Sequence, residues 1–73
     1  MKCHITVTDF VEKNTAIYVQ VTVYDEQKNQ WYQEELRFLD ERLYGDLVHV
    51  KKSPLTEQCR LETITYLKKY FNR

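Results

Sequence analysis

The sequence predicts an α+β fold: a three-stranded or four-stranded antiparallel β-meander with one C-terminal α-helix packed on one face. Three observations lead to this prediction. In residues 15–38, a run in which β-branched residues alternate with polar or aromatic ones is followed by a polar break and then by a second run, residues 30–38. Residues 2–9 alternate in the same way, and apolar residues recur at helical spacing after Ser53 and Pro54.

The first strand is expected at residues 2–9, because Cys3, Ile5 and Val7 alternate with polar residues and would share the inner face. Residues 10–14 would connect it to the second strand. Asn14 is the expected turn residue, since asparagine adopts a left-handed backbone at low cost. The inner face of the second strand would carry Ile17, Val19, Val21 and Val23.

If the loop of the second hairpin has four residues, 26–29, it sets the register of the two strands. The inner pairs are then Val23–Tyr32, Val21–Glu34, Val19–Leu36 and Ile17–Phe38, and the outer pairs Tyr24–Trp31, Thr22–Gln33, Gln20–Glu35 and Tyr18–Arg37. This register turns Glu34 inward, where an unpaired carboxylate is costly. Three explanations remain open for Glu34: a cation partner, a bulge in the strand, or a position at the margin of the sheet.

The C-terminal third predicts a brief strand and a long helix. Residues 47–50 are short, apolar and β-branched, so they are the candidate fourth strand. The helix is expected over about residues 54–71, with Ser53 as N-cap and Pro54 in the first turn. Its apolar face would consist of Leu55, Cys59, Ile64, Tyr66, Leu67, Tyr70 and Phe71. Arg60 should extend along the edge of that face, whereas Leu61 should be exposed or part of an interface.

Length and charge limit the classes of function. At 73 residues, the chain is expected to form one small α+β domain over residues 1–73. The 11 basic and 11 acidic residues cancel, which argues against a strongly electrostatic nucleic-acid binder. Residues 1–40 are net acidic and residues 41–73 net basic. This asymmetry indicates either two separate patches or internal neutralisation.

The N-terminal residues and the two cysteines predict a reducing compartment. No apolar segment of the secretory type follows Met1, and no apolar run approaches the ~20 residues that span a bilayer. We therefore expect a cytoplasmic protein without a membrane partner, in which Cys3 and Cys59 are free thiols in the core rather than a disulfide.

Residues that could carry chemistry are few and poorly spaced. Cys3, His4, His49 and Cys59 are the available soft metal ligands, but no Cys-x-x-Cys or His-x-x-x-His pair exists. The only serine, Ser53, is better explained as a helix cap than as a nucleophile. We therefore expect no metal, no cofactor, no catalytic residue and no enzymatic activity.

The outer face of the sheet is the predicted binding surface. Its large side chains are Tyr18, Tyr24, Trp31 and Arg37. Aromatic and arginine side chains are good interface anchors, so this face predicts an adaptor or inhibitor with a protein partner. The alternative is that these residues form cross-strand pairs worth about 0.2–1 kcal/mol each and do nothing more. Nucleic acid is disfavoured, because nearby acidic residues would repel phosphate; these are Asp25, Glu26 and Glu35.

Two other functions stay open. A nucleic-acid-binding module would use Lys51, Lys52, Lys68 and Lys69, with stacking by Trp31. These lysines fall at opposite ends of a predicted helix about 27 Å long. A structural homo-oligomer, such as a homodimer, would instead use the outer face or Leu61 in a symmetric contact.

The predicted order, a three-stranded meander followed by a helix, is similar in topology to small DNA-binding domains of some phage-type integrases and plant ethylene-response factors. Those domains read DNA with a basic sheet, so the resemblance implies a DNA-binding face. The corresponding strands here carry Asp25, Glu26, Glu34 and Glu35. Because no motif is shared and the charge differs, we assign no family.

Overall fold

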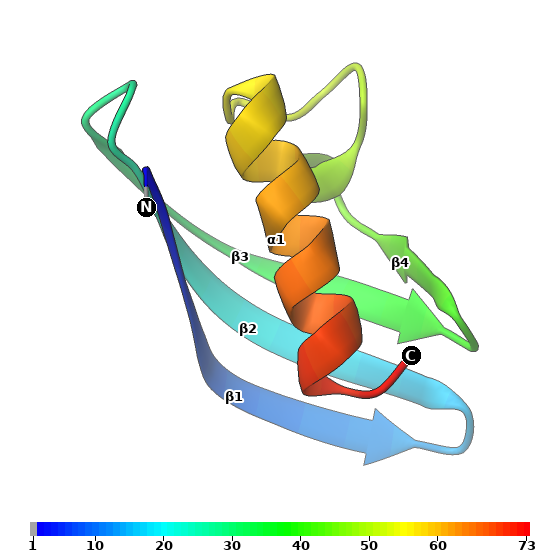
Figure 1. Cartoon of the computed structure of the whole chain (residues 1–73). Coiled ribbons are helices and arrows are strands. Elements are labelled where there is room, and N and C mark those ends of the chain that lie inside the picture. The colour runs from blue at the N-terminus through cyan, green and yellow to red at the C-terminus, as the bar shows by residue number, and fades with distance from the viewer. Residues whose placement is uncertain (1) are drawn as a thin grey trace.

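A computed structural model describes residues 2–73 and has the α+β fold that the sequence predicts. The strands are β1 (Cys3–Lys13), β2 (Ala16–Asp25), β3 (Gln30–Leu39) and β4 (Arg42–Tyr44), followed by the 3₁₀ helix η1 (Asp46–Val48) and the helix α1 (Glu57–Tyr70). The sheet is antiparallel in the order β1-β2-β3-β4, so the four-stranded alternative is correct. Figure 1 shows α1 lying across one face of the curved sheet.

The register of the second hairpin is confirmed over its whole length. The pairs run without a shift from Ala16 opposite Leu39 to Asp25 opposite Gln30. Asn29 closes the four-residue loop with a φ of 50°, which asparagine tolerates. The inward residues of β2 and β3 are almost completely buried and form the centre of the core; these are Ile17, Val19, Val21, Val23, Leu36 and Phe38.

The first strand is longer than predicted. It continues to Lys13 and contains a β-bulge between Val7 and Asp9, so residues 10–13 are strand rather than connection. A bulge adds one residue to one strand and thereby exchanges which residues point inward. Phe10 consequently lies opposite Val19 and packs edge-to-face on Phe71, with the ring centroids 5.1 Å apart. The turn at Asn14, with a φ of 56°, is confirmed.

The fourth strand lies earlier than predicted. β4 precedes Gly45, whereas residues 46–48 form η1. Leu47 and Val48 are both buried. Adjacent residues of a strand point to opposite faces, so a strand at an open edge would bury only one of them. The tight turn of η1 lets both side chains enter the core.

Glu34 points inward and is half-buried, and its partner is a backbone amide. Its Oε1 accepts a hydrogen bond from the N–H of Leu47 at 3.2 Å. The strand β3 pairs with β2 without a bulge at this residue. Of the three explanations expected from the sequence, the position at the margin of the sheet is confirmed, because β4 pairs only with residues 37–39 of β3 and leaves β3 as the edge strand at Glu34. The carboxylate at this edge holds the start of η1 against the sheet.

Replacing Glu34 with alanine is expected to lower the free energy of unfolding by about 1 kcal/mol, because the amide of Leu47 loses its acceptor. Glu34→Gln keeps an acceptor oxygen and should lose less than half of that amount. Urea unfolding followed by circular dichroism measures both values. Equal losses in the two variants would contradict the role of this hydrogen bond.

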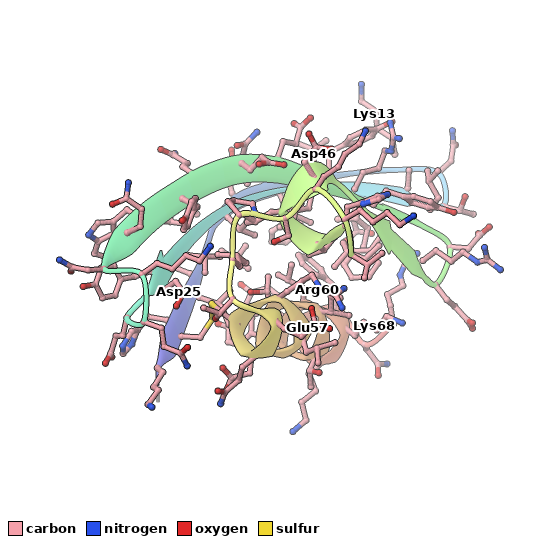
Figure 2. All side chains as sticks on the ribbon, turned by 90° about the horizontal axis from the view of Figure 1, so that it is seen from above. Lys13, Asp25, Asp46, Glu57, Arg60 and Lys68 are labelled. Carbon is pink, nitrogen blue, oxygen red and sulfur yellow. A yellow bond between two sulfur atoms is a disulfide. The ribbon has the colours of Figure 1, made fainter. Side chains whose placement is uncertain are left out.

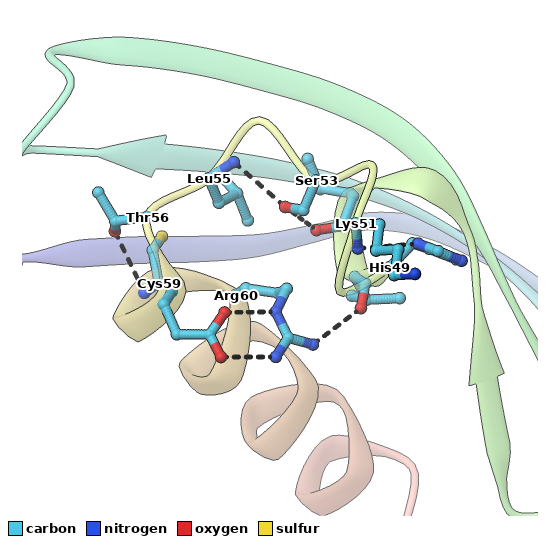
Figure 3. Close-up of polar contacts among 10 residues, drawn as sticks. His49, Lys51, Ser53, Leu55, Thr56, Cys59 and Arg60 are labelled. Atoms are coloured by element: carbon cyan, nitrogen blue, oxygen red, sulfur yellow. Dashed lines mark hydrogen bonds and ion pairs between the residues drawn. The ribbon is translucent and has the colours of Figure 1, made fainter.

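The helix begins three residues later than predicted. Thr56, not Ser53, is the N-cap, and its hydroxyl oxygen accepts from the N–H of Cys59 at 3.4 Å (Figure 3). The hydroxyl of Ser53 donates to the carbonyl of Leu47 at 2.5 Å and accepts from the N–H of Leu55 at 3.1 Å. Ser53 therefore stabilises the segment between η1 and α1 rather than the helix itself.

The buried face of α1 is narrower than predicted. Cys59, Thr63 and Leu67 follow one another at intervals of four and are buried, whereas Tyr66 and Tyr70 are exposed. Thr63 fits the core because its hydroxyl donates to the carbonyl of Cys59 at 2.8 Å. Because this hydrogen bond satisfies the hydroxyl, a polar residue can occupy the middle of the buried face, between Cys59 and Leu67.

Arg60 lies at the edge of the buried face, as predicted, and is fixed there by three hydrogen bonds. Its guanidinium binds both carboxylate oxygens of Glu57, at 3.0 and 2.9 Å, and donates to the carbonyl of Val48 at 3.2 Å (Figure 3). The hydrogen bonds from Arg60 lower the pKa of Glu57. The pair ties the first turn of α1 to the end of η1.

The cysteines form a disulfide, so the expectation of two free thiols is wrong. Cys3 at the start of β1 and Cys59 in the first turn of α1 are bonded, with their Cα atoms 5.3 Å apart. Both side chains point inward as predicted, and the helix lies on the sheet so that they meet; Figure 2 shows the sulfur atoms in yellow. Among residues 2–73, no helix is both long and apolar enough to cross a membrane.

Candidate functional site

The outer face of the sheet is the face opposite α1. In Figure 2 the helix lies below the sheet, and side chains including Lys13 project upward from the opposite side. In the part of the chain that the structure describes, no helix packs on this face. The predicted residues Tyr18, Tyr24, Trp31 and Arg37 all belong to it, but the structure divides them into two groups.

The first group is an aromatic row at the end of the sheet next to the loop of residues 26–29. His4, Tyr24 and Trp31 lie opposite one another on β1, β2 and β3. The Tyr24 and Trp31 rings are tilted, with centroids 4.7 Å apart, and His4 lies 6.0 Å from Tyr24. Tyr24 is half-buried, whereas Trp31 is 67% exposed. This row therefore presents an indole that is held in place but open to solvent.

The aromatic row has fixed polar partners. The hydroxyl of Tyr24 donates to the side-chain oxygen of Asn29, and the ring of His4 pairs with the carboxylate of Glu26. The hydrogen bond with His4 lowers the pKa of Glu26. These contacts restrict the rings, so less conformational entropy is lost when a partner binds.

The second group is a basic row at the other end of the sheet. Val11, Tyr18, Arg37 and Tyr44 lie opposite one another on the four strands. Val11 is 50% exposed and Tyr44 is 40% exposed. The neighbouring register line adds Lys13, Ala16, Leu39 and Arg42. We include both lines in the term basic row, which combines exposed apolar area with three cations.

The two rows are separated by a polar stretch. Tyr18 and Tyr24 are six residues apart on β2, which corresponds to about 20 Å. Between them lie Thr6, Asp9, Gln20, Thr22, Gln33 and Glu35. The amide of Gln20 donates to the carboxylate of Glu35 at 3.1 Å. A single partner must extend over this polar stretch to contact both rows.

Asp25 does not belong to the outer face. The expectation that its charge would repel phosphate from that face is therefore wrong. It is fully buried on the inner side, where its Oδ1 accepts from the N–H of Gln27 at 3.1 Å. Its Oδ2 accepts from the N–H and the hydroxyl of Thr56, at 2.8 and 3.0 Å. Asp25 thus connects the end of β2 to the N-cap of α1, on the helix side of the sheet in Figure 2.

The four lysines proposed for nucleic acid do not form one patch. Lys51 and Lys52 precede α1, whereas Lys68 and Lys69 lie in its last turn. All four are exposed, but a helix of 14 residues, about 21 Å long, separates the two pairs. Lys68 instead lies near Arg42, since both line one shallow hollow with Leu43, Tyr44 and Ile64.

Within residues 2–73, no three His, Cys, Asp or Glu side chains gather closely enough to hold a metal ion. The sulfur atoms of Cys3 and Cys59 are bonded to each other, so neither is a thiolate that could bind a metal. His49 follows η1, whereas His4 lies on β1, and the Nδ1 of His49 accepts a hydrogen bond from the N–H of Lys51 at 3.0 Å.

No protein-family model, curated protein or solved structure matches this chain. The candidate site therefore depends on geometry alone. Sequence reasoning missed Val11 and Tyr44, because the bulge in β1 and the position of β4 decide which side of the sheet they occupy. It also missed Leu39, although this residue follows from the predicted register, in which it lies two residues beyond Arg37 on the same face.

Proposed function

We propose that this protein is a small non-enzymatic interaction module, an adaptor or inhibitor, that binds a protein partner through the outer face of its sheet. The observation that supports this proposal most strongly is Trp31, which packs on Tyr24 yet stays 67% exposed. Burying a large fixed aromatic side chain at a protein interface releases much free energy for little entropy.

The charges of the outer face favour a protein over nucleic acid. Lys13, Arg37 and Arg42 lie at one end, whereas Asp9 and Glu35 lie in the middle. A nucleic-acid backbone is uniformly negative, so it would meet attraction at one end and repulsion in the middle. A protein surface with both signs of charge can complement this arrangement.

The triple variant Tyr18→Ala, Trp31→Ala, Arg37→Ala tests this proposal. Capture of a protein partner from an extract of the native cell should be lost, because both rows lose their anchors. The fold should survive, since the deleted cross-strand pairs contribute about 0.2–1 kcal/mol each. The matched control is Val50→Ala with Tyr70→Ala, which removes exposed side chains elsewhere and should leave capture unchanged. Capture that survives the triple change would reject the outer face as the site.

Two measurements distinguish the other functions. A salt titration with a short DNA duplex and a single strand should show no binding at low salt, whereas binding that weakens steeply with salt would establish a phosphate contact instead. Sedimentation over a range of concentrations should show a monomer, and a dimer that the triple variant abolishes would assign the outer face to self-association.

A further inference from the structure

The outer edge of β1 is an open strand edge with polar backbone groups directed outward. β1 is the first strand of the sheet, and no strand within residues 2–73 pairs with its other side. The N–H of Glu26 donates to the carbonyl of Lys2 at 2.9 Å. Since bonded pairs alternate along an antiparallel ladder, the N–H and C=O of Cys3, Ile5 and Val7 point toward the open edge. Such groups can pair with an added strand.

An apolar groove lies directly beside this edge. Its volume is about 410 Å³, and it is lined by Ile5 of β1 and by Gln58, Leu61, Glu62, Thr65 and Tyr66 of α1. The helical residues follow the spacing i, i+3, i+4, i+7 and i+8, so they form one continuous stripe along α1. Leu61 is 49% exposed and Tyr66 is 38% exposed. A strand added to β1 would lie beneath this stripe and direct every second side chain into the groove.

Glu62 gives the groove an unsatisfied charge. Its Oε2 is buried and has no hydrogen-bond partner among residues 2–73. A buried carboxylate oxygen without a donor is costly, so a cation supplied from outside would gain a charge-assisted hydrogen bond there. The groove is therefore complementary to an apolar segment that also carries a lysine or arginine.

We propose that the edge of β1 and the adjacent groove bind an extended segment of a partner protein by strand addition. The segment has apolar side chains at alternate positions, which contact Leu61 and Tyr66, and a basic side chain that pairs with Glu62. A second copy of this chain fits less well. Two-fold pairing of β1 with itself would bring the two Glu62 carboxylates into one groove, where like charges repel. This site is distinct from the outer face and does not depend on it.

A phage library of random seven-residue peptides, panned on the full oxidised chain, tests the proposal. Enriched peptides should alternate apolar with other residues and carry lysine or arginine. Their affinity should fall at least tenfold on Leu61→Asp, which introduces a charge at an exposed position and leaves the fold intact. Glu62→Gln should reduce the preference for a basic over a neutral peptide at least fivefold.

Val7→Pro removes a backbone N–H from the open edge alone, and Val7→Ala is its matched control because it keeps that N–H. Val7→Pro should weaken the peptide at least tenfold and Val7→Ala less than threefold. The proposal is overturned if no peptide is enriched, if Leu61→Asp binds the peptides equally, or if Trp31→Ala removes binding instead. A concentration-dependent dimer that Leu61→Asp abolishes would also overturn it, because the occupant would then be a second copy.

Discussion

Reduction of the Cys3–Cys59 disulfide is expected to lower the free energy of unfolding by about 2–4 kcal/mol. The bond joins residues 56 positions apart, so it closes most of the chain into one loop. Such a cross-link restricts the unfolded chain more strongly as the loop grows. Because a 73-residue chain has a small core, this loss is a large share of its stability. Urea unfolding with and without dithiothreitol measures the difference.

The variant Cys3→Ala, Cys59→Ala provides the control. It should match the stability of the reduced protein and should not respond to dithiothreitol. A wild-type protein whose unfolding midpoint is the same with and without reductant would contradict the contribution of the disulfide.

Replacing Asp25 with alanine is expected to cost about 2–4 kcal/mol, because three donors lose their acceptor in a buried site. These donors are the N–H of Gln27 and the N–H and hydroxyl of Thr56. The loss also disturbs the start of α1, since the hydroxyl of Thr56 caps the helix. Thermal and urea unfolding report the change.

Two further variants separate this network from charge in general. Glu41→Ala removes an exposed carboxylate outside this network and should change stability by no more than about 0.5 kcal/mol. In a double-mutant cycle, Asp25→Ala and Thr56→Val should be coupled, because each deletes the same hydrogen bond. Additive losses would show that Asp25 and Thr56 act independently.

The central hairpin could be predicted because its signals agree. Four inward β-branched residues of β2, together with a four-residue polar loop, allow only one register that buries Leu36 and Phe38. The outer pairs Tyr24–Trp31 and Tyr18–Arg37 follow from the same register. The sequence therefore predicts the strands that carry the candidate site.

Features that depend on long-range packing could not be predicted. The bulge at Thr8 has no local signal, yet it turns Phe10 inward and Val11 outward. In the sequence, Asp25 looks like a solvent-exposed residue at the start of a loop. It is buried because Thr56, 31 positions later, donates hydrogen bonds to its carboxylate. The spacing of apolar residues predicts that Tyr66 and Tyr70 are buried, but both are exposed. The polar Thr63 is buried instead, because its hydroxyl donates to a carbonyl of its own helix.

The disulfide also depends on long-range packing and could not be predicted from the sequence. The inward direction of both cysteines follows from strand and helix periodicity. Their proximity does not, because it depends on where α1 crosses β1. An expected reducing compartment predicts free thiols, but it does not determine the distance between the two sulfur atoms.

The central claim is that one partner contacts both rows of the outer face, about 20 Å apart. The most direct test is the dissociation constant of the captured partner for two half-variants. One is Tyr24→Ala with Trp31→Ala, and the other is Tyr18→Ala with Arg37→Ala. Each should weaken binding at least tenfold, because each row supplies an anchor. If either half-variant binds within twofold of the unaltered protein, the partner does not contact that row, and if both do, the outer face is not the partner-binding surface.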